Sequence, residues 1–126
     1  LPPDEMTGAG DAEGKAARPV EGAADVAAKI PVSLQGRWGL APADCEPGRS
    51  DAKGLMVVLP DELRFYESRA RLVKLTDSSP DSMGGDFAFT GEGMTWSRYE
   101  SLKLHGNALV RTETEPVASY TYARCR

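Results

Sequence analysis

The fold is decided by residues 86–114, which read DFAFTGEGMTWSRYESLKLHGNALVRTET. Phe87 and Phe89 alternate with smaller or polar residues, a pattern typical of a strand with one buried face. Gly91-Glu92-Gly93 then predicts a turn, and Gly106-Asn107 predicts a two-residue hairpin because both residues tolerate a positive φ. Three strands that follow one another through tight turns predict an antiparallel meander.

The same pattern extends to both sides of this segment. Short apolar stretches bounded by turn residues predict about eight strands, at residues 37–40, 54–59, 63–68, 70–76, 86–90, 94–99 (with Leu102 and Leu104 following), 108–114 and 119–125. Within 70–76, strict alternation would place Leu72 and Lys74 on one face and Arg71, Val73 and Leu75 on the other. A meander of eight strands can close on itself and so remove its free edges. We therefore expect an all-β fold, a small up-and-down antiparallel β-barrel over residues 31–126.

Residues 1–30 differ from the rest of the chain. They are rich in Ala, Gly, Pro and acidic residues, contain no aromatic residue, and carry six acids against three bases. Such a composition buries too little apolar surface to offset the entropy of ordering the chain. We expect a flexible N-terminal tether at 1–30, with a short helix over 22–29 as an option because alanines favour helix there.

Composition argues against several functions. The chain of 126 residues has a formal net charge of -4 and no strong cluster of Lys and Arg, which disfavours binding to nucleic acid. The longest apolar run, residues 55–59, is far shorter than the roughly 20 residues that span a bilayer. The chain begins at Leu1, so we expect a processed product, and a lipid anchor upstream of Leu1 would tether it to a membrane.

Cys45 lies just past the first predicted strand and Cys125 ends the last one, so the two are neighbours only if the sheet closes. We expect a disulfide between them, which closes a loop of about 80 residues and contributes roughly 4.5 kcal/mol in the chain-entropy model. That bond implies an oxidising compartment, periplasmic or extracellular. The alternative is a pair of free thiols in a cytosolic protein.

Gly36-Arg37-Trp38 opens the first predicted strand after a short turn-like segment, residues 30–35. This is similar to the G-x-W signature at the start of lipocalins and other calycin barrels. The resemblance implies that Trp38 plugs one end of the barrel and packs against a basic residue of the last strand, for which Arg124 is the match. The small size, the Leu-x-Gly-x-Trp opening and the early cysteine look more like bacterial envelope barrels, namely periplasmic protease inhibitors and lysozyme-inhibitor lipoproteins. The second lipocalin signature and the Ser-Gly-rich inhibitory loop are missing, so the likeness covers architecture alone.

Two features are candidate binding sites. The longest polar stretch, residues 76–85, predicts a loop, and loops on a rigid barrel commonly carry recognition residues. Its candidate partner-binding residues, with Met83 as an exposed apolar tip, are Ser79, Asp81, Ser82, Met83 and Gly84. Arg69 and Arg71 share one face of a strand and could bind an anion in bidentate fashion. The alternative for these two arginines is a solvated barrel exterior.

No residue pattern indicates catalysis, a metal or a cofactor. His105 is the only histidine and lies beside the predicted Gly106-Asn107 turn, where a surface position is expected. Asp77, Asp81 and Asp86 could ligate calcium, but their spacing fits no EF-hand and a solvated loop is the better interpretation. The sequence contains no nucleophile elbow, phosphate-binding loop or zinc-protease motif.

Six aromatic residues could line a ligand pocket, but a barrel this small needs such side chains to fill its interior. They are Phe65, Phe87, Phe89, Trp96, Tyr120 and Tyr122. We expect a non-enzymatic envelope protein that recognises a partner protein through barrel loops, with inhibition of a hydrolase as one form of that role. The alternatives are a carrier of a small apolar ligand and a structural accessory lipoprotein of a membrane complex.

Overall fold

A computed structural model describes residues 29–126. Two single-turn 3-10 helices, η1 (Val32–Leu34) and η2 (Pro42–Cys45), flank the first strand. The strands are β1 (Gly36–Gly39), β2 (Leu55–Val58), β3 (Glu62–Arg64), β4 (Arg69–Ser79), β5 (Ser82–Gly91), β6 (Met94–His105), β7 (Ala108–Glu113) and β8 (Ala118–Arg124). The predicted tether at 1–30 and helix at 22–29 lie outside the described residues, apart from Lys29 and Ile30 at their C-terminal end.

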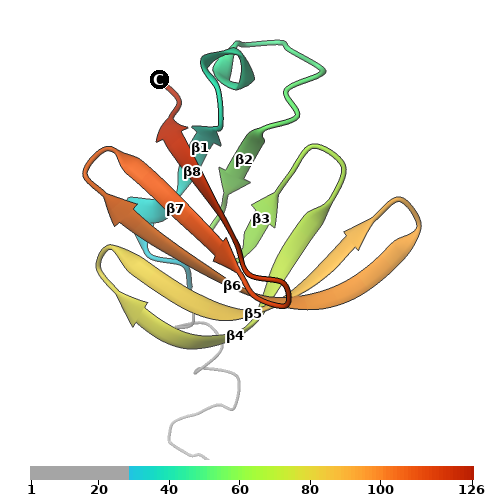
Figure 1. The fold of residues 1–126 in the computed structure, drawn as a ribbon, viewed down its shortest axis with the longest axis vertical. Helices are drawn as coiled ribbons and strands as arrows, with labels where there is room; N and C mark the ends of the chain where they lie inside the picture. The colour runs from blue at the N-terminus through green and yellow to red at the C-terminus, as the bar shows by residue number, and fades with distance from the viewer. Residues whose placement is uncertain (1–28) are drawn as a thin grey trace, which may run out of the picture.

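Each strand pairs antiparallel with the next strand along the chain, and β8 pairs with β1 to close the barrel (Figure 1). The closing contact is short: Trp38 lies opposite Arg124, and Gly39 lies opposite Ala123. The predicted all-β, eight-stranded, up-and-down barrel is therefore confirmed.

The barrel wall is uneven in height. Strands β4, β5 and β6 have 11, 10 and 12 residues, whereas β1, β2 and β3 have 4, 4 and 3. β6 pairs with β7 only from Glu100 onward, so the outer half of the β5–β6 hairpin projects beyond β7 (Figure 1). The long strands give the molecule one broad outer face, and this face carries the site described below.

The barrel interior is packed with apolar side chains. Trp38 is buried and donates an Nε1 hydrogen bond to the Leu34 carbonyl oxygen at 2.9 Å, which holds η1 across one end of the barrel. Ile30 is also buried, and its backbone N–H donates to the Pro60 carbonyl oxygen at 2.8 Å. The other buried members of the core are Met56, Val58, Leu63, Ala70, Met83, Phe87, Phe89, Leu102, Leu109 and Tyr122. Every strand thus contributes to one core.

The polar stretch at 76–85 is a β-hairpin and not a loop. β4 ends and β5 begins on either side of a two-residue turn, Pro80-Asp81. Met83 faces the interior, is 2% exposed and lies opposite Leu102 on β6. The prediction of an exposed Met83 at a loop tip is therefore wrong. The polar side chains lie on the solvent face of the hairpin. Gly85 faces the interior, and because glycine has no side chain, the sequence lacks the apolar residue that would mark this position as buried.

The alternation predicted for 70–76 is also wrong beyond Leu72. The register of β4 against β5 shifts between Leu72 and Lys74, which marks a β-bulge. Leu72 and Leu75 consequently both pack against the core, whereas Val73 is 63% exposed. The sequence pattern did not reveal the bulge, because the extra residue resets the alternation between the two faces.

Strand β3 is shorter than predicted. It ends at Arg64, because the Phe65 N–H donates to the Ser68 carbonyl oxygen at 2.8 Å and turns the chain. This tight turn brings Arg64 opposite Arg69 on β4. Two arginines therefore lie side by side on the outer face of the barrel.

Candidate functional site

The Cys45–Cys125 disulfide forms as predicted, with an S–S distance of 2.07 Å and a separation of 80 residues along the chain. Cys45 ends η2, and Cys125 directly follows β8. The Cys125 N–H donates to the Arg37 carbonyl oxygen at 2.9 Å, so the bridge extends the β1–β8 contact that closes the barrel. A structural disulfide points to an oxidising, extracytoplasmic compartment.

Arg124 closes the same seam from the solvent side. Its guanidinium carbon lies 4.2 Å from the centre of the Trp38 ring, the arrangement that the resemblance to calycins implies. Its Nη1 and Nη2 atoms donate to the carbonyl oxygens of Gln35 and Ser33 at 3.0 and 2.8 Å. Gly36 has a φ of +125°, and a Cβ atom there would lie 2.9 Å from Arg124 Nη1. These contacts join β1, β8 and the segment before β1 at the closing seam of the barrel.

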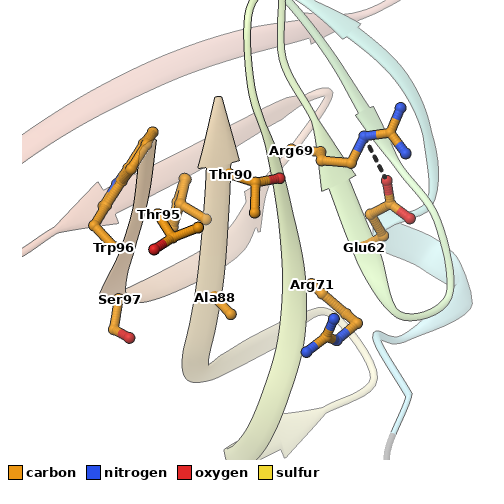
Figure 2. Close-up of a pocket in the computed structure, with 9 residues that line it drawn as sticks. Glu62, Arg69, Arg71, Ala88, Thr90, Thr95, Trp96 and Ser97 are labelled. Carbon is orange, nitrogen blue, oxygen red and sulfur yellow. Dashed lines mark ion pairs between the residues drawn. The ribbon is translucent and has the colours of Figure 1, made fainter. Parts of the chain in front are cut away.

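A shallow depression of about 690 Å³ lies on the outer face of the barrel (Figure 2). We name it the basic depression; β3, β4, β5 and β6 contribute its lining residues, which are Glu62, Arg69, Arg71, Ala88, Phe89, Thr90, Thr95, Trp96 and Ser97. The register of the sheet determines which residues form the floor of the basic depression. Arg69 lies opposite Thr90, and Arg71 lies opposite Ala88. On the next strand, Thr95 lies opposite Thr90 and Ser97 lies opposite Ala88. Small and hydroxyl-bearing side chains thus leave space beside both guanidinium groups.

Positive charge is in excess at the basic depression. Glu62 Oε2 accepts a hydrogen bond from Arg64 Nε at 3.0 Å and lies 3.8 Å from Arg69 Nε (Figure 2). Within residues 29–126, Arg71 has no ion-pair partner. Three arginines against one glutamate give a local surplus of positive charge on a chain whose net charge is -4. The two arginines that approach Glu62 are exposed, with side-chain exposures of 51% for Arg64 and 63% for Arg69, so both guanidinium groups are accessible to an incoming anion.

Five planar groups form one stack inside the barrel, at the end where β5 turns into β6. Phe89 stacks on Trp96 with ring centres 5.4 Å apart, and on Phe65 with ring centres 6.1 Å apart. The Arg111 guanidinium then lies 4.8 Å from the Phe65 ring centre and 4.4 Å from the Tyr120 ring centre. Aromatic and cation–π contacts of this geometry each contribute about 1 kcal/mol. The stack occupies space that a small apolar ligand would need at this end.

Arg111 also joins a buried group of polar side chains. Its Nη1 donates to Glu100 Oε1 at 3.2 Å and to Glu113 Oε2 at 2.8 Å. Its Nε donates to Tyr122 Oη at 3.1 Å. Glu100 has no exposed surface and Arg111 is 8% exposed, so this ion-pair group is part of the barrel interior.

The two carboxyl groups of this cluster have opposite pKa shifts. Burial raises the pKa of Glu100 to about 8, and a hydrogen bond with Glu113 adds to that effect. For Glu113, burial acts to raise the pKa, but the hydrogen bond from Glu100 and the charge of Arg111 outweigh it, so the pKa is lowered. Two neighbouring carboxyl groups whose pKa values move apart are the signature of a shared proton.

The five residues proposed as a partner-binding loop do not form an exposed loop. Ser79 Oγ donates to Asp81 Oδ1 at 3.1 Å and lies 2.6 Å from Ser82 Oγ, so these groups satisfy one another at the hairpin turn. Gly84 lies beneath Tyr99, whose hydroxyl group would collide with a Cβ atom there. With Met83 in the core, nothing in this hairpin presents an apolar tip to a partner.

The remaining candidate site residues lie apart from one another on the barrel surface. His105 is exposed at the end of β6, and Asp77 and Asp86 are exposed on the outer faces of β4 and β5. Within residues 29–126, no group of three or more His, Cys, Asp or Glu side chains is placed to hold a metal ion. In the same part of the chain, no helix has the length and apolar character needed to cross a membrane.

Sequence reasoning missed the buried charges, although the sequence contained a signal for them. Glu100 shares its strand face with Trp96 and Leu102, and Arg111 shares its face with Leu109. An acid and a base at inward positions of two neighbouring strands predict an ion pair inside the barrel.

Comparison with known proteins finds no match among protein-family models, curated proteins or solved structures. The barrel architecture is established by the strand pairing itself. The function must therefore be argued from the geometry and charge of this chain.

Proposed function

We propose that the protein is a non-enzymatic binding protein of an oxidising extracytoplasmic compartment, and that it recognises an acidic segment of a partner protein at the basic depression. The observation that carries the proposal is the placement of Arg69 and Arg71. Both project from β4 onto the basic depression, and Arg71 has no ion pair within residues 29–126. An exposed guanidinium without an acidic partner is available for a carboxylate from another molecule.

The spacing of the two arginines favours an extended ligand. Residues two apart on a strand lie about 6.6 Å from each other on the same face. Carboxylates two residues apart on an extended peptide have the same spacing, so each could meet one guanidinium. Hydroxyl groups of Thr90, Thr95 and Ser97 provide further hydrogen-bonding partners along the floor.

The charge distribution of the chain favours a short acidic segment as the ligand over a long polyanion. The surplus is confined to a few arginines on a chain of net charge -4, which gives little long-range attraction for nucleic acid. The stack inside the barrel counts against a small apolar ligand, because Phe65, Phe89 and Trp96 pack against one another and against the core.

The likeness to calycin-type envelope proteins is a second part of this proposal. Trp38 under Arg124 and the Cys45–Cys125 bridge fit a small barrel of the bacterial periplasm, with or without a lipid anchor upstream of Leu1. Hydrolases are the partner class that this likeness suggests first. Lysozyme and secreted proteases are accordingly the first proteins against which inhibition should be assayed.

The proposal is tested by charge reversal. We expect the full chain to bind a fluorescently labelled peptide of alternating Asp and Ser, with an affinity that falls at least about tenfold in the double variant Arg69→Glu, Arg71→Glu. Fluorescence anisotropy at low ionic strength measures this affinity. Lys103→Glu is the matched control, because it reverses an exposed charge on β6 outside the depression and should leave binding unchanged.

Two results would contradict the proposal. One is equal affinity of the double variant and the unaltered chain for the acidic peptide. The other is equal affinity of the unaltered chain for the acidic peptide and for a Lys-Ser peptide of the same length. If an assayed hydrolase is inhibited, the double variant should lose that inhibition while the Lys103→Glu variant retains it.

A further inference from the structure

Glu100 is the most deeply buried charged residue in the described part of the chain. It has no exposed surface, and it lies on β6 directly opposite Glu113 on β7. Both carboxyl groups accept a hydrogen bond from the same atom, Arg111 Nη1, at 3.2 and 2.8 Å. Like charges directly opposite each other on neighbouring strands are destabilising, and burial makes the repulsion stronger.

The two carboxyl groups have very different surroundings. Glu100 Oε1 accepts one long hydrogen bond, and Glu100 Oε2 is buried with no partner among the donors of residues 29–126. Glu113 receives the shorter bond from Arg111, lies 3.8 Å from Arg98 and reaches the surface in part. An ionised carboxylate in the place of Glu100 would lack the hydrogen bonds that offset its desolvation.

Within residues 29–126, Arg111 is the one cation that forms an ion pair with Glu100. From β7 it meets Arg111 and Glu113, and from β8 the phenol groups of Tyr120 and Tyr122 lie around Arg111. On its own strand the neighbouring cation is Arg98, whose Nη1 donates to the Thr114 carbonyl oxygen at 3.3 Å. On β5 the residue opposite Glu100 is Gly85, which has no side chain, and β4 presents Leu75 there.

We propose that Glu100 and Glu113 hold one proton between them, with Glu100 as the acid and Glu113 as the carboxylate, and so form a buried proton-binding site that makes the stability of the barrel depend on pH. The proton lies on Glu100 Oε2 and is donated to Glu113, which gives the unpartnered oxygen its hydrogen bond. Arg111 then neutralises the single remaining negative charge. When the proton leaves to solvent, two carboxylates share one guanidinium inside the barrel.

The direction of the pH dependence follows from the two states of Glu100. Its ordinary pKa is 4.5, and burial with the Glu113 hydrogen bond raises the pKa in the folded chain to about 8. Between these values the unfolded chain releases the proton while the folded chain keeps it. The stabilisation is therefore complete below about pH 4.5 and is lost as the pH rises to about 8. The folding equilibrium constant should fall about tenfold per pH unit within this window.

The first measurement is an NMR titration of the side-chain carboxyl carbons in the isotope-labelled full chain. We expect the resonance of Glu100 to titrate well above the range of ordinary carboxyl groups, with that of Glu113 below it. A Glu100 midpoint within the ordinary range would overturn the proposal.

The second measurement compares urea unfolding of the unaltered chain and the Glu100→Gln variant at about pH 6 and about pH 8. Gln keeps a hydrogen-bond donor where the protonated acid stands but cannot ionise. We expect the unaltered chain to lose about fiftyfold in its folding equilibrium constant between these pH values, and the variant to lose far less. Glu46→Gln, which removes an exposed acid, should behave like the unaltered chain. Equal pH dependence in the Glu100→Gln variant would sink the idea.

Discussion

At Gly36 the backbone takes a φ of +125°, a conformation that residues with a Cβ atom rarely adopt. The Arg124 side chain crosses over the same residue to reach the face of Trp38. The backbone conformation therefore favours glycine at this position, and a Cβ atom would in addition require the end of the Arg124 side chain to shift. Gly36 and Trp38, the first and last residues of the G-x-W motif, thus act together, because Gly36 leaves space for the Arg124 guanidinium that covers the Trp38 ring.

Replacement of Gly36 by Ala is expected to lower the free energy of unfolding by about 1–3 kcal/mol, chiefly through backbone strain, with a smaller loss from displacing the end of the Arg124 side chain. Urea denaturation followed by tryptophan fluorescence measures the loss. Gly48→Ala is the matched control, because Gly48 also has a positive φ, +73°, but has no atom within 4 Å of a Cβ placed there. Equal losses in the two variants would show that the Arg124 contact contributes nothing.

Single residues differed in how well the sequence predicted their roles. Trp38 and Arg124 could be paired in advance, because the resemblance of Gly36-Arg37-Trp38 to the calycin signature implies a basic residue of the last strand against the Trp ring. Arg111 and Glu100 were overlooked, because a charged residue in a strand is usually assigned to the solvent face. Their inward positions follow from alternation with Leu102 and Leu109, but the pairing of Glu100 with Glu113 depends on cross-strand register.

At the level of secondary structure, too, the sequence predicted some features and missed others. Turns made of glycine and asparagine fixed the strand order, because their backbone preferences are local. The β4–β5 hairpin was mistaken for a loop, since Ser, Asp and Pro are common both in loops and on the wet face of a long hairpin. The bulge after Leu72 was also missed, because strand pairing across the sheet determines it.

Met83 tests the corrected β4–β5 hairpin. Met83→Ala should lower the free energy of unfolding by about 2–4 kcal/mol, because it removes a buried side chain that faces Leu102 in the core. Urea denaturation again provides the measurement. Met94→Ala is the control, because Met94 is 63% exposed and its loss should change stability by less than about 0.5 kcal/mol. A loss as small as the control's at Met83 would restore the exposed-loop interpretation.

For the whole molecule, barrel closure depends on a short β1–β8 contact of two residue pairs and on the bridge beside it. The double variant Cys45→Ser, Cys125→Ser should lower the free energy of unfolding by about 2–5 kcal/mol, because the unfolded chain loses a cross-link over 80 residues. Calorimetry should show a lower Tm for this variant. Reduced and alkylated native protein should match it, and an unchanged Tm would mean that the strand contact alone closes the barrel.

The disulfide also turns most of the described chain into a covalent ring. Of the eight strands in residues 29–126, seven lie between Cys45 and Cys125, and β1 precedes that interval. A protease that cuts once at any hairpin turn inside the ring opens it without releasing a fragment. In a compartment rich in secreted proteases, a nicked copy therefore keeps its strands tethered to one another and can retain the barrel.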